Sequence, residues 1–140
     1  IGDYSPTNFF NVGTLAETFE VMDRGDFSLL EDVVVYKPMS NELVKASSSK
    51  ITLEGGDLRI VAKSPGKSML LLPLEFSNCF AFKSNDKNSE FLDAFRVNGI
   101  LTGLLFDENL DVTAQIRYGI FSNSGCRLKD LEDYKVLTER

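Results

Sequence analysis

The pattern of apolar and polar residues changes its period once along the chain, just after Gly25. Before that point, Leu15, Phe19 and Met22 recur at intervals of three and four residues, which places them on one face of a helix. A glycine is a common stop signal for a helix, because it adopts the backbone conformation that ends one. The pattern therefore predicts a short amphipathic helix over residues 15–23.

After residue 32, apolar residues alternate with polar ones or form short β-branched runs, which is typical of strands. Turn-forming residues separate these runs at intervals of about 8–12 residues, the spacing of sandwiches and barrels. Residues 1–13 are expected to be an irregular lead-in, and residues 14–140 a single domain. The predicted fold class is all-β with one short N-terminal helix, built as an antiparallel β-sandwich or jelly roll. The expected strands are 33–36, 50–54, 57–63, 69–74, 79–82, 94–97, 100–106 and 112–121.

Four clusters of turn formers are expected to reverse the chain direction. They are Gly55–Asp57, between the two strands of an expected hairpin, Ser64–Lys67, where Pro and Gly stand as in a type II turn, the pair Asn98-Gly99, and Asp107–Asn109. Residues 126–134 show two leucines at helical spacing and are expected to form no more than a turn of helix. The core should contain the apolar residues of the strands, namely Val34, Ile60, Leu70, Leu72, Val97, Leu101, Leu104 and Ile116.

The net charge of −6 is spread along the chain and no cluster of lysines and arginines interrupts it. Proteins that bind nucleic acid need such a cluster, because they gain affinity by displacing counterions from phosphates. Nucleic acid is therefore not an expected partner. An anionic membrane surface is disfavoured for the same reason.

Candidate catalytic chemistry is sparse. The sequence contains no histidine, which removes the commonest general base and the commonest metal ligand. Asp107, Asn109 and Asp111 begin like a calcium-binding loop, but the glycine and glutamate that such a loop needs later are replaced by Val112 and Tyr118. Several carboxylates offer glycosidase pairs without any spacing that singles one out. No catalytic residue, metal or cofactor is predicted.

The two cysteines, Cys79 and Cys126, follow a central strand and the last long strand. Adjacent strand ends meet in a sandwich, so the two are expected to be close in space. They either form a disulfide, which would fit an oxidising compartment, or are both buried thiols.

Four segments of the chain resemble one known family. They are residues 15–36, with a short helix, an Asp-Phe pair and a valine-rich strand; residues 58–73, with paired strands; Phe95–Gly103, with a strand–Asn-Gly–strand signature; and Gln115–Tyr118, a closing strand. Together they are similar to the C-terminal domain of YfhO-like multi-pass bacterial membrane glycosyltransferases. In place of that family's Tyr-Pro-Gly-Trp-like turn, this chain has residues 75–79.

The resemblance implies an extracytoplasmic β domain, attached to a membrane part that transfers sugar from a polyprenyl phosphate. Catalysis would then lie outside this chain, and the membrane part of the same parent chain would be one partner. The expected function is contact with a glycan or cell-envelope polymer. The expected ligand-binding residues lie in or near the turns, and are Phe76, Asn78, Arg96, Asn98 and Tyr118. The alternatives are a structural or protein-interaction domain of a cell-surface protein and, third, a free-standing glycan-active enzyme.

Overall fold

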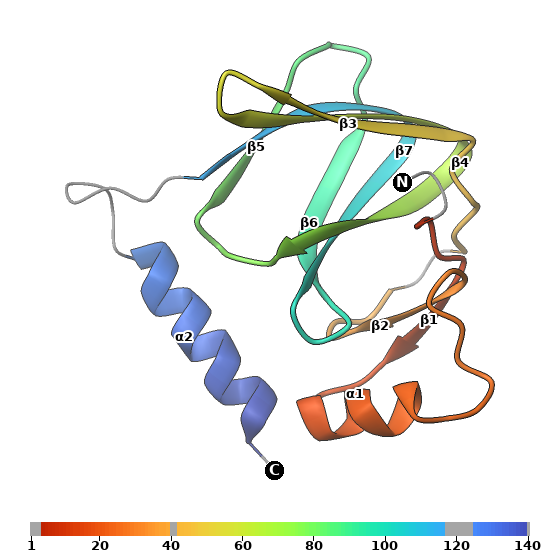
Figure 1. Ribbon diagram of the computed structural model, residues 1–140, viewed down its shortest axis with the longest axis vertical. Coiled ribbons are helices and arrows are strands. Elements are labelled where there is room, and N and C mark those ends of the chain that lie inside the picture. Colours follow the sequence, from red (N-terminus) through yellow and green to blue (C-terminus); the bar gives the residue numbers. More distant parts are fainter. Residues whose placement is uncertain (1–3, 40–41, 117–124, 140) are drawn as a thin grey trace.

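The computed structural model describes residues 4–39, 42–116 and 125–139, with the side chain of Ile116 left out. In chain order its elements are β1 (Asn8–Asn11), α1 (Leu15–Met22), β2 (Asp32–Val35), β3 (Ser48–Glu54), β4 (Asp57–Glu75), β5 (Phe80–Ser84), β6 (Phe91–Val97), β7 (Leu101–Ile116) and α2 (Gly125–Thr138). The strands form one sheet in the order β1-β2-β6-β7-β4-β3, and β5 also pairs with β7. Helix α1 lies at the β1–β2 end of the sheet, and helix α2 lies to one side of the sheet (Figure 1).

The protein is mostly β-sheet with a short N-terminal helix, as the sequence predicts. The sheet is nevertheless mixed, because β1 pairs with β2 in parallel, so the antiparallel prediction is wrong at this edge. The prediction of an irregular lead-in is also wrong for Asn8–Asn11, which form β1. The strands belong to one continuous sheet, and a two-sheet sandwich or jelly roll is not confirmed.

Two of the four predicted turns do not reverse the chain. Strand β4 runs through Ser64–Lys67 and β7 runs through Asp107–Asn109. The two interruptions lie opposite each other, because the pairing register jumps from Lys63 with Asn109 to Lys67 with Asp107. Three residues of β4 therefore oppose the single residue Glu108, whose φ of 60° is left-handed. Such a bulge bends a strand pair without ending it, and it tolerates a proline that cannot donate to the ladder.

Apolar residues from both sides of this bulge meet in one core. Ile60 and Val112 come from one side, and Leu72 and Leu104 come from the other. A second cluster lies around Val33, Met69 and Val97. Neighbouring residues of β4, such as Met69 and Leu70, fall in different clusters, because successive side chains of a strand point to opposite faces.

The predicted core is largely confirmed. Val34, Ile60, Leu70, Leu72, Val97 and Leu104 are each no more than 1% exposed. Leu101 is only partly buried, which departs from the prediction, because it is the first residue of β7 and directly follows the turn formed by residues 98–100. The side chain of Ile116 lies outside the part that the structure describes.

The predicted helix is confirmed as α1, Leu15–Met22. It begins at Thr14, whose Oγ1 accepts a hydrogen bond from the Glu17 backbone N–H at 3.2 Å. The Glu17 carboxylate in turn accepts from the N–H of Gly13 at 3.1 Å. These bonds satisfy donors that a helix start leaves free. A hydrogen bond of 2.7 Å between Thr18 and the Tyr36 hydroxyl ties the helix to the end of β2.

The second helix is much longer than the sequence predicts. α2 spans Gly125–Thr138, where no more than one turn was expected. Leu137 is its only buried residue, and Leu128, Leu131, Tyr134 and Val136 are all more than half exposed. The apolar residues therefore do not form the buried stripe by which an amphipathic helix is recognised in a sequence.

Gly103 of β7 is expected to be intolerant of a side chain. A Cβ atom there would lie 2.9 Å from Val97 Cγ1 and 3.4 Å from Met69 Sδ. Overpacking of this kind costs about 1–3 kcal/mol, so Gly103→Ala should lower the free energy of unfolding by that amount in a urea titration. Gly25→Ala is the matched control, because a Cβ at Gly25 meets nothing within 4 Å. Equal stability of the two variants would contradict the close packing at Gly103.

Candidate functional site

Two cavities lie between α2 and the sheet, and both are lined by Phe76 and Arg96. The first, of about 520 Å³, lies at the end of β4 and the first half of α2. The second, of about 430 Å³, reaches the end of β2, strand β6 and the last turns of α2. We call the two together the α2 groove. Each volume falls within the range of about 300–1,000 Å³ that is usual for small-molecule sites.

Phe76 and Arg96 form the floor shared by the two cavities. The guanidinium carbon of Arg96 lies 5.5 Å from the centroid of the Phe76 ring, within the distance of a cation–π contact. Arg96 also donates a hydrogen bond to the Gly99 carbonyl at 3.3 Å. The backbone N–H of Phe76 donates to the Ile100 carbonyl at 2.7 Å. The pair is thus attached to the β6–β7 turn, and both side chains remain partly exposed.

Asn78 holds α2 in place. Its backbone N–H and its side-chain amide each donate to one oxygen of Asp130 at 2.6 Å, and the amide also reaches Asp133 at 2.9 Å. Ser77 donates to the other Asp130 oxygen at 2.5 Å. Asn78 lines the second cavity, but these bonds occupy its amide hydrogens. Its role in the structure is therefore to position the helix.

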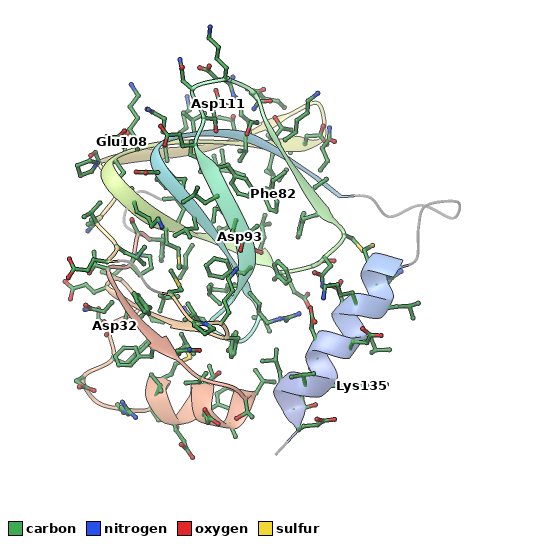
Figure 2. All side chains as sticks on the ribbon, turned by 180° about the vertical axis from the view of Figure 1, so that it is seen from behind. Asp32, Phe82, Asp93, Glu108, Asp111 and Lys135 are labelled. Carbon is green, nitrogen blue, oxygen red and sulfur yellow. A yellow bond between two sulfur atoms is a disulfide. The ribbon has the colours of Figure 1, made fainter. Side chains whose placement is uncertain are left out.

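The disulfide between Cys79 and Cys126 fixes the start of the same helix. The two Cα atoms lie 5.0 Å apart, so the cysteines are as close as the sequence hypothesis required. Figure 2 shows the bond at the first turn of α2. One wall of the groove is thus connected to the loop after β4 by a covalent bond and by the hydrogen bonds of Asp130.

Asn98 has a structural role in the β6–β7 turn, which is a confirmed chain reversal like the predicted hairpin turn between β3 and β4. Asn98 and Gly99 have left-handed φ values of 49° and 88°, and with Ile100 they form a three-residue loop between the paired residues Val97 and Leu101. The Asn98 side chain accepts from the Val34 N–H at 2.8 Å, and its own N–H donates to the Val34 carbonyl at 3.0 Å. Asn98 lines neither cavity of the groove.

Of the five residues expected to bind a ligand, the structure brings Phe76, Asn78 and Arg96 together in the groove. Tyr118 lies outside the described residues. Sequence reasoning missed the contributions of α2, among them Arg127 and Tyr134. The only signal for them was their closeness in sequence to Cys126.

Three further charged or phenolic groups of the groove have partners in the structure. Lys37 forms an ion pair with Asp93, and its Nζ lies 4.3 Å from the centroid of the Phe95 ring. Lys129 lies 3.8 Å from Asp133. Burial raises the pKa of the Tyr36 phenol above its ordinary value, so this hydroxyl remains a neutral hydrogen-bonding group near pH 7.

No family model matches the chain, and neither a curated protein nor a solved structure is detectably similar to it. Among the helices of the described residues, neither is long and apolar enough to cross a membrane.

A second charged site lies at the end of the sheet away from both helices, where Figure 2 labels Asp111. Arg59 donates to the two Asp111 oxygens at 3.0 and 2.8 Å. These bonds lower the pKa of Asp111 below its usual value. Asn85 also donates to Asp111 at 3.0 Å. Within the described ranges no group of three or more potential metal ligands occurs, and the perturbed carboxylate is explained by its ion pair.

Proposed function

We propose that the chain is a non-catalytic, extracytoplasmic domain of a membrane-bound glycosyltransferase, and that its α2 groove binds a glycan or cell-envelope polymer. The observation that carries this proposal is the Phe76–Arg96 pair, which lies on the shared floor of two cavities of ligand size. The family resemblance supports the assignment of the parent protein as a membrane-bound glycosyltransferase. The membrane part of the same parent chain would be the second partner.

The composition of the groove suits a sugar. Ligand sites commonly combine apolar and aromatic walls with a few polar groups that fix orientation. Phe76 supplies a ring, Arg96 supplies N–H donors, and Tyr134 on α2 lines the first cavity with 54% of its surface exposed. An aromatic ring can cover the apolar C–H face of a sugar while nearby polar groups hydrogen-bond its hydroxyls.

The disulfide supports an extracytoplasmic location. Cys79 and Cys126 are joined, and such bonds persist in oxidising compartments, whereas cytosolic thiols are kept reduced.

A non-catalytic role is supported by how the carboxylates of the groove are used. Asp130 and Glu75 both line the first cavity, and two carboxylates are what a glycosidase needs. Hydrogen bonds from Ser77 and Asn78 occupy both oxygens of Asp130, however. An oxygen held in this way is poorly placed to exchange a proton with a substrate.

A second candidate is a structural or protein-interaction domain. It is favoured by α2, where Leu128, Leu131 and Val136 are 60%, 54% and 64% exposed. Neighbouring apolar side chains on one exposed element can mark a surface that another protein covers.

Replacement of Phe76 by alanine should weaken binding of a cell-envelope polysaccharide by about tenfold or more, since a lost aromatic contact is worth roughly 0.5–1.5 kcal/mol beyond its buried area. The measurement is co-sedimentation and titration with purified peptidoglycan, teichoic acid and neutral polysaccharides. Phe19→Ala is the control, because Phe19 is 62% exposed on α1 and lines neither cavity. Equal affinities of the two variants would place the binding site elsewhere, and binding to none of the polymers would favour the protein-contact alternative.

A further inference from the structure

One cation of the α2 groove differs from its neighbours in its partners. Lys37 and Lys129 each lie beside a carboxylate, that of Asp93 and that of Asp133. Within the part of the chain that the structure describes, Arg96 has no carboxylate partner. Its contacts there are the Gly99 carbonyl and the face of the Phe76 ring. A partly buried guanidinium is therefore held in the groove without a direct carboxylate contact among the described residues.

The contacts of Arg96 leave most of its hydrogen-bonding capacity available. A guanidinium has five N–H donors in a planar fork, and the Gly99 carbonyl takes one of them at 3.3 Å. The Phe76 ring and this carbonyl hold the side chain in one orientation before any ligand arrives. A pre-oriented fork of this kind matches the two oxygens of a carboxylate or phosphate, and such charge-assisted bonds are about twice as strong as neutral ones.

The second cavity carries charge of the sign opposite to that of the whole chain. The chain has a net charge of −6, whereas the charged residues lining the second cavity are Lys37, Arg96 and Lys129 against Asp133. In the first cavity, Arg96 and Arg127 are balanced by Glu75 and Asp130. The global charge repels anions in general, so an anion bound here would be selected by the geometry of the groove. The partly exposed Phe76 lies beside Arg96 in both cavities and offers apolar surface for the ring that carries the anion.

We propose that the ligand of the α2 groove is an acidic saccharide, and that Arg96 binds its oxyanion. This inference rests on the proposed glycan-binding function and adds the chemical class of the ligand. A uronate and a sugar phosphate share the required group, two oxygens on one charged centre attached to a sugar ring. Lys37 and Lys129 would attract the anion over a longer distance while their ion pairs with Asp93 and Asp133 stay intact.

The test is isothermal titration of the disulfide-bonded protein with four probes. They are a trimer of galacturonic acid, the same trimer as its methyl ester, glucose 1-phosphate and inorganic phosphate. The free-acid trimer or the sugar phosphate should bind at least tenfold more tightly than the neutral ester and than inorganic phosphate. Which of the two binds distinguishes a uronate from a sugar phosphate. The proposal is overturned if the free acid binds no more tightly than its ester and the sugar phosphate binds no more tightly than inorganic phosphate, or if none of the probes binds.

Variants assign the effect to Arg96. Arg96→Gln should weaken binding of the acidic probe by about 10- to 100-fold, the size expected for loss of a charge-assisted hydrogen bond. Arg96→Lys keeps the charge and should lose less. Arg24→Gln removes the same charge from an exposed position at the end of α1 that lines neither cavity, and should bind like the unmodified protein. A circular-dichroism melt of each variant checks that the fold is retained. Should Arg96→Gln bind like Arg24→Gln, the inference fails.

The two proposals fail in different ways. If neutral polysaccharides bind, and Phe76→Ala weakens them while Arg96→Gln does not, then the groove binds glycans but not through an acidic group. If neither acidic nor neutral saccharides bind, both the glycan function and its acidic specificity are overturned.

Discussion

Removal of the Cys79–Cys126 disulfide should lower the free energy of unfolding by about 4 kcal/mol, a large share of the roughly 5–15 kcal/mol that stabilises a domain. The bond joins residues 47 positions apart, so it restricts the unfolded chain strongly. The double variant Cys79→Ser with Cys126→Ser should be compared with the oxidised protein in urea titrations monitored by circular dichroism. The control is the unmodified protein with reductant, which should lose a similar amount once the bond is open.

The same variant should show a local effect on α2. The helix buries only Leu137, and an isolated helix of this length is marginally stable in water. Without the disulfide, the helix would lose its covalent attachment, and the hydrogen bonds that Asp130 and Asp133 accept from Ser77 and Asn78 would remain. Amide hydrogen exchange in α2 should therefore accelerate more than in β4 or β7. A stability loss below about 1 kcal/mol, with unchanged exchange in α2, would contradict a constraining role for this bond.

The strand positions could be predicted from the sequence because the alternation of apolar and polar residues follows directly from which side chains are buried. Val34, Ile60 and Leu72 were expected in the core and are buried. The number of sheets could not be predicted in the same way. Turn formers such as Pro65 and Gly66 indicate that a strand is interrupted, but not by how much the chain changes direction. That depends on the partner strand, and here the interruption lies opposite Glu108 of β7, so the two irregularities combine into one bend.

The remaining differences come from elements stabilised mainly by their neighbours. β1 has four residues and lies at the edge of the sheet, where Phe9 pairs with Val33 of β2. Its local sequence, with Pro6 and Asn8, favours a turn. α2 carries exposed apolar residues and no buried stripe, and it is attached by a disulfide and by hydrogen bonds to Ser77 and Asn78. Contacts of this kind join residues about fifty positions apart, so a local pattern does not contain them.

The residues of the candidate site also differ in how well the sequence predicted their roles. Phe76 and Arg96 lie in segments that sequence reasoning placed near turns, and the structure brings them together. Asn78 and Asn98 were chosen by the same reasoning, but their amides bond to α2 and to β2. An asparagine near a turn is as suited to completing backbone hydrogen bonds as to binding a ligand. The two roles separate only when the partners are known.

Leu72→Ala is expected to lower the free energy of unfolding by about 2–5 kcal/mol, the range for a leucine truncated in a well-packed core. Leu72 is 1% exposed, lies on β4 opposite Thr102 of β7, and belongs to the cluster that both sides of the bend share. The alanine would remove apolar contacts and leave a cavity that the two long strands cannot easily close, because each is paired on both of its edges for part of its length. The measurement is a urea titration of the oxidised protein at neutral pH.

The matched control for this substitution is Leu53→Ala. Leu53 lies on the edge strand β3 and is 73% exposed, so its truncation should change stability by no more than about 0.5 kcal/mol. The contrast between the two leucines tests whether this part of β4 lies in the core. It does not test the register, because a shift of one residue would only move Leu72 to the opposite face of the sheet. That face also holds a buried cluster, which includes Met69 and Leu71, so a shifted strand would still bury Leu72 among apolar residues. Only a loss below about 0.5 kcal/mol for Leu72→Ala, the value typical of a surface position, would show that β4 lies outside the core.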